Sequence, residues 1–417
     1  GNVAYSPSNR FLVSCVGPRA NVLDAVSLES LHVFSCVDKI DKVEISPDSC
    51  YILCALISRG IVQCFSLSDR SWCCRINESV AGIVSVKWCP DSRHIAVESD
   101  FGIQTAIWSL VDNTSCLISS PKPGVGPAFS ECGRFMAIAH RMECKDYIGV
   151  YSTGPWTELT KFRCQTSDLA SILWTPSSAH LIVADSHLNY KLLIYSASGE
   201  LVHEYEAYQN ALGIHSTAEP AQTQLVSHPL LAVGSYDGNT RLLSTRSWTV
   251  AFVLPSSHPT EMTSIMSQGI LTTVEVVGDS SLNETSSDVF SFSKTTFVAD
   301  DKYGNAYVTK SLKSLPHLTP DPHGKGSLKM GVNWLGWSGD GQLLAVRAEN
   351  YPRCLWIWNA IDGQLNSLLV QLSAITCARW RPPQPDRPHL KPMLAFSTGV
   401  SRVYFWTPAG TSWVDIP

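Results

Sequence analysis

The chain repeats one short pattern along most of its length. Each copy has an apolar segment that ends in an aromatic residue or isoleucine, a turn rich in Ser, Pro, Asp or Gly, and a second apolar segment. The clearest copies occupy residues 3–15, 43–55, 86–98, 127–139, 172–184 and 335–347, and a related copy begins at 377. Self-similarity at a fixed period marks repeat architectures, so this feature constrains the fold more than composition does.

Two landmarks recur in each copy. The first closes the first apolar segment, and it stands at Tyr5, Ile45, Trp88, Phe129, Trp174, Trp337 and Trp380. The second is an aromatic residue followed by a small polar one, and it stands at Phe65, Trp108, Tyr151, Tyr195, Trp358 and Trp406. Successive first landmarks are 40 to 45 residues apart where copies are adjacent, and the second landmark follows after 20 to 26 residues. This period leaves room for four strands, which is typical of a propeller blade of the WD-repeat type.

The sequence therefore predicts an all-β fold, a β-propeller of about eight or nine four-stranded blades. We expect the blades near 1–36, 43–77, 84–118, 125–164, 169–206, 212–254, 260–313, 332–370 and 375–417. The unit at 260–313 is degenerate, and a polar insertion interrupts it near 278–288. Nine units of equal period fit one wide ring, or a seven-blade ring followed by a partial second one.

Tryptophan is frequent, with 13 copies in the chain. Large flat side chains suit the wedge-shaped space between stacked blades. We assign seven tryptophans at the landmarks as structural blade anchors: Trp88, Trp174, Trp337, Trp380, Trp108, Trp358 and Trp406. The first four of these are expected to be largely buried between blades.

Composition excludes several classes of protein. The net charge of −5 and the pI near 6.2 disfavour a nucleic-acid binder, whose domain is usually strongly basic. No apolar run approaches the roughly 20 residues that a membrane span needs, so neither nucleic acid nor membrane is an expected partner. The 14 cysteines lie mostly in apolar segments without any C-x-x-C pair, which favours a reducing, cytoplasmic environment and no metal site. No signal peptide is visible.

Catalytic signatures are absent from the sequence. It contains no G-x-S-x-G, H-E-x-x-H, P-loop or G-x-G-x-x-G motif, so we expect no catalytic residues, no cofactor and no enzyme activity. Two other readings stay open. One is a translation-initiation-type propeller that binds ribosome or RNA, although 31 basic residues face 36 acidic ones. The other is a propeller that hydrolyses esters or binds metal in its central channel.

Basic residues gather in the last unit of this sparsely charged chain. They form a candidate protein-interaction rim beside Tyr404 and Trp406, and they are Arg379, Arg381, Arg387, Lys391 and Arg402. Arginine beside aromatic residues is favoured at interface hot spots. A second, lysine-bearing segment spans 302–329. Either could meet an acidic partner surface, or could serve only solubility.

Several segments resemble the WD-repeat protein eight family in consecutive blades and in the family's order. They are residues 51–67, 144–151, 189–208, 231–238 and 402–410, and the similarity covers nearly the whole chain. The chain departs from standard WD repeats because the Trp-Asp pair is reduced to Trp-Ser, Trp-Asn or Tyr-Ser, and only Leu23-Asp24 keeps the acid. The insertion at 256–300 is particular to this chain.

This resemblance implies a non-enzymatic scaffold in the cytoplasm and cytoskeleton, at the centrosome or spindle pole. Members of the family bind a coiled-coil spindle-pole adaptor and, in fungi, a minus-end-directed kinesin. The resemblance thus implies a microtubule-associated assembly that anchors microtubule minus ends and organises the mitotic spindle.

Overall fold

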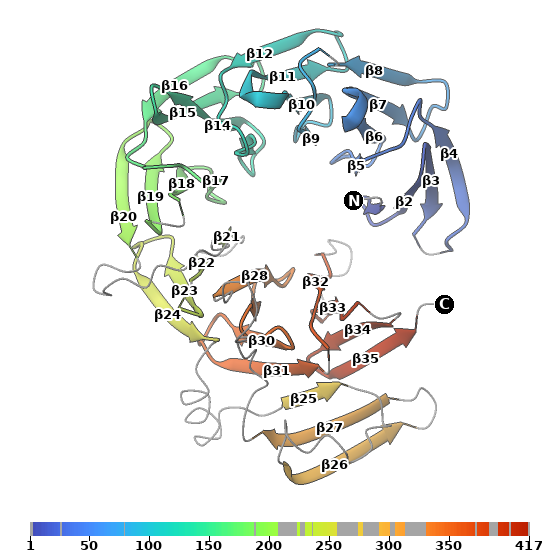
Figure 1. Ribbon diagram of the computed structural model, residues 1–417, viewed down its shortest axis with the longest axis vertical. Coiled ribbons are helices and arrows are strands. Elements are labelled where there is room, and N and C mark those ends of the chain that lie inside the picture. The colour runs from blue at the N-terminus through green and yellow to red at the C-terminus, as the bar shows by residue number, and fades with distance from the viewer. Residues whose placement is uncertain are drawn as a thin grey trace, which may run out of the picture. The chain divides into compact units, whose positions relative to one another are not determined.

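Eight sheets, antiparallel except for one parallel pair of strands, make up the regular structure of the described residues (Figure 1). Seven of them have four strands in simple up-and-down order, and the eighth contains such a set of four within seven strands. This is the strand order of propeller blades, and it confirms the all-β, propeller-type fold with four-stranded blades. We number the blades one to eight in chain order.

The computed structural model describes most of the chain. The described residues are 3–25, 27–78, 80–186, 189–206, 223–225, 230–235, 237–256, 274–277, 292–300, 305–312, 331–371, 373–382, 391–399 and 402–415. The chain divides into unit 1, Gly1–Ala207, and unit 2, Tyr208–Pro417.

Unit 1 holds the first five blades and two short 3-10 turns. Its strands are β1 (Val3–Tyr5), β2 (Phe11–Val16), β3 (Arg19–Asp24), β4 (Ser30–Ser35), β5 (Lys42–Ile45), β6 (Tyr51–Leu56), β7 (Ile61–Ser66), β8 (Cys73–Asn77), β9 (Ser85–Trp88), β10 (His94–Glu98), β11 (Gln104–Ser109), β12 (Ser115–Ser119), β13 (Ala128–Phe129), β14 (Phe135–Met142), β15 (Lys145–Ser152), β16 (Glu158–Arg163), β17 (Ser171–Trp174), β18 (His180–Ala184), β19 (Lys191–Ser196) and β20 (Leu201–Glu206). The turns are η1 (Ile57–Arg59) and η2 (Asp100–Gly102). First strands of neighbouring blades touch, since β1 contacts β5, β5 contacts β9 and β13 contacts β17.

Unit 2 holds blades six to eight. Its strands are β21 (Thr223–Leu225), β22 (Leu230–Gly234), β23 (Asn239–Ser244), β24 (Val250–Pro255), β25 (Val274–Val277), β26 (Phe292–Asp300), β27 (Asn305–Leu312), β28 (Val332–Trp337), β29 (Leu343–Ala348), β30 (Cys354–Asn359), β31 (Leu365–Gln371), β32 (Cys377–Trp380), β33 (Leu394–Ser397), β34 (Arg402–Thr407) and β35 (Gly410–Asp415).

The degenerate blade predicted at 260–313 is not a separate blade. Its strands β25, β26 and β27 extend blade seven, giving the order β26-β27-β25-β31-β30-β29-β28. β25 runs parallel to β31, with Val274 opposite Leu368. A set of three strands leaves unpaired backbone groups at its edges. Here β25 pairs with β31, the outer strand of blade seven, and this pairing satisfies the groups on that side. The polar insertion predicted near 278–288 lies outside the described residues.

The two sequence landmarks meet in one row in six of the blades. In blade three, Ile95 of the second strand pairs with Trp88 on one side and with Trp108 on the other. The same arrangement recurs in Ile45/Ile52/Phe65, Phe129/Met136/Tyr151, Trp174/Leu181/Tyr195, Trp337/Leu344/Trp358 and Trp380/Leu394/Trp406. Each row packs in the layer shared with the preceding blade. The offset between the landmarks is nearly fixed because it is the number of residues that the chain needs to pass along the second strand and return on the third strand to the same row.

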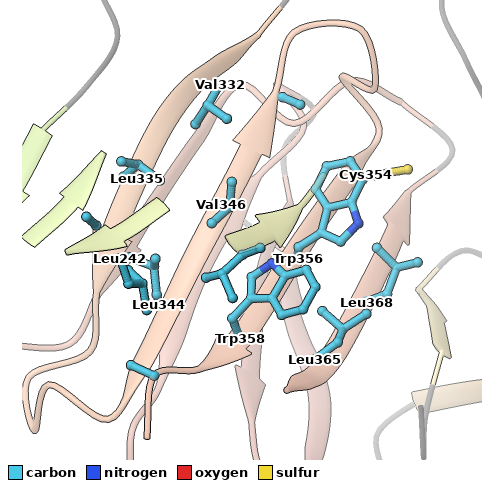
Figure 2. Close-up of a cluster of buried hydrophobic side chains, with 14 of the residues drawn as sticks. Leu242, Val332, Leu335, Leu344, Val346, Cys354, Trp356, Trp358, Leu365 and Leu368 are labelled. Atoms are coloured by element: carbon cyan, nitrogen blue, oxygen red, sulfur yellow. The ribbon is translucent and has the colours of Figure 1, made fainter. Parts of the chain in front are cut away.

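Central strands are buried on both faces. In β30, Trp356 and Trp358 pack toward blade six, whereas Leu355 and Ile357 pack toward blade eight. Figure 2 shows the two indoles in the first of these layers, beside Leu368. Because side chains alternate along a strand, burial of both faces requires an uninterrupted apolar run, which is what the sequence contains here.

The seven tryptophan anchors differ in burial. Trp88, Trp174, Trp358 and Trp406 are buried, whereas Trp337, Trp380 and Trp108 are only partly buried. Partly buried indoles reach polar atoms at the edge of the layer: Trp380 Nε1 donates to Gly336 O at 2.7 Å, and Trp108 Nε1 donates to a Glu78 carboxylate oxygen at 2.9 Å.

Polar side chains brace the turns between third and fourth strands. Asp24 accepts a hydrogen bond from the backbone N–H of Ser27 at 2.9 Å. In blade two a serine hydroxyl takes this position, and Ser66 accepts from the backbone N–H of Asp69 at 3.1 Å. In blade seven the Asn359 side chain accepts from the backbone N–H of Ile361 at 3.0 Å. The loss of the acid from the Trp-Asp pair therefore leaves the turn with a side-chain acceptor.

Replacement of Trp358 tests the row in blade seven. Trp358 is 2% exposed, and its indole Nε1 has no hydrogen-bond partner among the described residues. Trp358→Ala should lower the free energy of unfolding by about 3–5 kcal/mol, whereas Trp358→Phe should cost much less. Trp337→Ala, in the same row but partly buried, is the control and should cost less than Trp358→Ala in urea unfolding. An equal loss of unfolding free energy in Trp358→Ala and Trp337→Ala would contradict the difference in burial between the two residues.

Candidate protein-interaction surfaces

Each blade has two ends that carry loops. We call the upper end the one with the connections between second and third strands and between consecutive blades. The lower end carries the connections between first and second and between third and fourth strands. Because neighbouring strands are antiparallel, these two sets of loops lie at opposite ends of a sheet.

The structure does not bring the predicted arginine rim together. Arg381 follows β32 and Lys391 precedes β33, so both lie at the lower end of blade eight, where the Arg381 guanidinium donates to Lys391 O. Arg402 begins β34 at the upper end, and its guanidinium lies 5.4 Å from the centre of the Trp413 ring. Arg379 lies in β32 on the sheet face opposite that of Arg402, by strand alternation and register.

The prediction of a single rim is thus wrong for the described residues. Nearness in sequence did not imply nearness in space, because the chain crosses the sheet between Lys391 and Arg402. Arg387 lies outside the described residues. So does the lysine-bearing segment 302–329, apart from β27.

A buried ion pair lies at the upper end of unit 1. Lys122 Nζ is 3.1 Å from Asp146 Oδ2 and 2.7 Å from Asp168 Oδ1. Arg141 also contacts Asp168. The Lys122 ammonium, with Arg141, holds the pKa of the Asp168 carboxyl below its usual range. These charges join the connection after blade three to blade four and to the connection after blade four.

Asp185 holds the connection between β16 and β17, which joins blade four to blade five. Its carboxylate accepts hydrogen bonds from the backbone N–H groups of Ser167, Asp168 and Ser186, at 2.8 to 3.1 Å. Burial alone would raise the pKa of Asp185, but these N–H donors outweigh it and lower the pKa below its usual value. The acids at this end therefore act as loop braces.

Within the described ranges, no group of three or more His, Cys, Asp and Glu side chains is placed to hold a metal ion. In the same part of the chain, no helix is long and apolar enough to cross a membrane.

One group of exposed apolar residues on two neighbouring loops was not predicted from the sequence. It lies at the upper end of blade three, and its members, which we call the blade-three patch, are Val80, Val84, Phe101 and Ile103. The sequence signal that could have identified it is an aromatic residue at the turn Asp100-Phe101-Gly102, where polar residues are the usual choice.

Substitution of Asp185 tests its role as a brace. Because its folded-state pKa lies below the ordinary value of 3.8, its carboxylate contributes stability that is present above this value and is lost as the pH falls through the folded-state pKa. Asp185→Asn should lower the free energy of unfolding by about 1.5–3 kcal/mol at neutral pH. When unfolding is measured over a range of pH, the difference in unfolding free energy between the wild type and Asp185→Asn should become smaller below pH 3.8. Asp112→Asn, at an exposed aspartate of the same unit, should leave unfolding unchanged, and a deficit independent of pH at Asp185 would contradict the prediction.

Two known proteins are similar to the chain over most of its length. WD repeat-containing protein WRAP73 of Mus musculus is 34% identical over 416 residues, which are 99% of this chain and 86% of the mouse protein. An uncharacterized WD repeat-containing protein of Schizosaccharomyces pombe is 22% identical over 401 residues, or 92% of this chain and 76% of the yeast protein. A scan against models of protein families finds no match.

The similarity to the mouse protein extends through every blade that the structure describes. Both the level of identity and the strand order of the blades support one assignment. The chain belongs to the family of WD repeat-containing proteins that includes mouse WRAP73.

Proposed function

We propose that this protein is a non-enzymatic scaffold at the centrosome or spindle pole. It would join a coiled-coil adaptor and a minus-end-directed kinesin in a microtubule-associated assembly. In this role it anchors microtubule minus ends and organises the mitotic spindle.

The observation that supports the scaffold role is that the strands are used for packing between blades. Both faces of the central strands are occupied by packing between blades, as in β30, so the loops and outer edges remain for partners. The charged side chains at the upper end of unit 1 are engaged in holding loops together, as Lys122 and Asp185 are. The spindle-pole setting and the two partners come from the family resemblance of the blade segments.

The ribosome-binding reading is less well supported. Contacts to RNA phosphates need a surface rich in lysine and arginine. The described basic residues of blade eight are divided: Arg381 and Arg402 lie at opposite ends of the sheet, and Arg379 and Arg402 lie on opposite faces.

A tagged copy of the full chain tests the proposal. In dividing cells it should concentrate at spindle poles, and affinity purification with quantitative mass spectrometry should recover coiled-coil and motor proteins. Trp358→Ala, which weakens a blade layer, should reduce both signals. An even cytoplasmic distribution together with co-sedimentation with ribosomes would overturn the proposal in favour of RNA binding.

A further inference from the structure

The blade-three patch consists of large exposed apolar side chains on two adjacent loops. Val80 and Val84 lie in the connection from β8 to β9, and Phe101 and Ile103 lie in or beside η2, between β10 and β11. Val80 is fully exposed and Phe101 is 85% exposed. Single exposed apolar side chains are ordinary, but neighbouring ones on one surface mark sites of interaction.

Close contacts lock these loops to one another. The backbone N–H of Asp100 donates to Ala81 O at 3.2 Å. On the other side, a Cβ added at Gly102 would lie 2.7 Å from Pro123 Cγ, so only glycine permits this approach. The patch is therefore formed before any partner arrives, which lowers the entropic cost of binding.

Phe101 adopts an unusual backbone conformation. Its φ of 58° and ψ of 13° lie in the left-handed region, which bulky side chains rarely occupy. The Asp100 carboxylate accepts a hydrogen bond from the Phe101 N–H at 2.8 Å and holds this turn. The ring adds nothing to the core, since it points into solvent. Trp156 and Trp248 share this left-handed conformation at other turns, so the backbone alone does not mark a site; at Phe101 it presents a large apolar ring to solvent.

The charged border of the patch is acidic. Asp100 belongs to η2, and Glu78 lies at the start of the loop that carries Val80. Among the described residues neither carboxylate forms an ion pair, although Glu78 accepts the hydrogen bond from Trp108.

The cations Arg59 and Lys122, on the loops to either side, already have carboxylate partners. Arg59 pairs with Asp38 at 2.6 Å, and Lys122 pairs with Asp146 and Asp168. The surface therefore offers an apolar centre beside unpaired negative charge, which favours a partner with apolar and basic side chains. The same acids disfavour an anionic membrane surface.

The form of the partner follows from the backbone of these loops. Backbone N–H groups of these loops are already engaged: Gly82 N donates to Glu78 O at 2.9 Å, Val84 N to Glu98 O at 2.9 Å and Asp100 N to Ala81 O at 3.2 Å. An added strand would need unpaired backbone groups, whereas a helix satisfies its own backbone and binds through side chains alone.

We infer that the blade-three patch docks an amphipathic helix of a partner protein, with an apolar stripe flanked by lysine or arginine. The inference rests on the proposed scaffold function and assigns it a surface. Phe101 is the central anchor, and Asp100 and Glu78 meet the basic flank.

The test uses the purified full chain and two fluorescent helical peptides. One has leucines at positions i, i+3, i+4 and i+7 flanked by lysines, and its twin has glutamate in place of lysine. Fluorescence anisotropy should show binding of the lysine peptide and at least a roughly tenfold weaker affinity for the glutamate twin. Asp100→Asn keeps the acceptor for the turn and removes the charge, so it should reduce this difference.

Phe101→Gly separates binding from folding. Glycine suits the left-handed conformation, so the melting temperature should equal or exceed that of the wild type, while affinity for the lysine peptide falls about tenfold or more. Val111→Gly is the matched control, since Val111 is a 69% exposed residue at the lower end of the same blade and its loss should leave affinity unchanged. Ile103→Ser should weaken the same peptide without affecting melting.

Several results would overturn the inference. They are equal affinity for the two peptides, no binding of either peptide, unchanged binding by Phe101→Gly, and binding to vesicles containing phosphatidylserine that Phe101→Gly abolishes. The last of these would assign the patch to a membrane. If the Phe101→Gly protein binds no peptide yet still concentrates at spindle poles with its partners, the scaffold function stands and uses another surface.

Discussion

The row that links the two landmarks of a blade ties that blade to the one before it. In blade three, Trp88, Ile95 and Trp108 lie across three strands and pack as one layer on blade two. Every other central-strand residue then faces the next blade, so both faces of the central strands are mostly occupied by apolar side chains. This accounts for the low share of charged residues, 16%, and for the nearly uninterrupted apolar sequence of inner strands such as β6 and β30.

Because the layers exclude polar groups, the turns have to supply their own hydrogen bonds. Ser49 illustrates this at the lower end, where its hydroxyl accepts from the backbone N–H of Ser8 in the preceding blade at 3.1 Å. Asp48 in turn donates its backbone N–H to the Ser92 hydroxyl at 2.9 Å. Small polar residues at these positions thus link consecutive blades, and the Trp-Asp pair can be lost without leaving a turn unsupported.

The period and the landmarks were sufficient to predict the propeller-type fold. The landmarks pair across consecutive strands of one blade, so their spacing depends only on the pairing of residues close in sequence. Other features depend on contacts between distant segments. Nothing in the sequence near β25 indicates that it pairs in parallel with β31. The arginine rim failed for a similar reason, since Arg381 and Arg402 stand on opposite sides of one crossing of the sheet. The left-handed turn at Phe101 depends on how η2 packs against neighbouring loops.

The packing between blades also makes the blade-three patch rigid. β10 and β11, which carry η2 between them, contribute Ile95 and Ile107 to two different layers, so the turn is held from both faces of its blade. A strained, exposed phenylalanine can persist only where its flanking strands cannot relax. The packing that occupies both faces of the strands is therefore also what gives a loop such as 99–103 a defined shape, which is how a rigid framework can present residues on its loops.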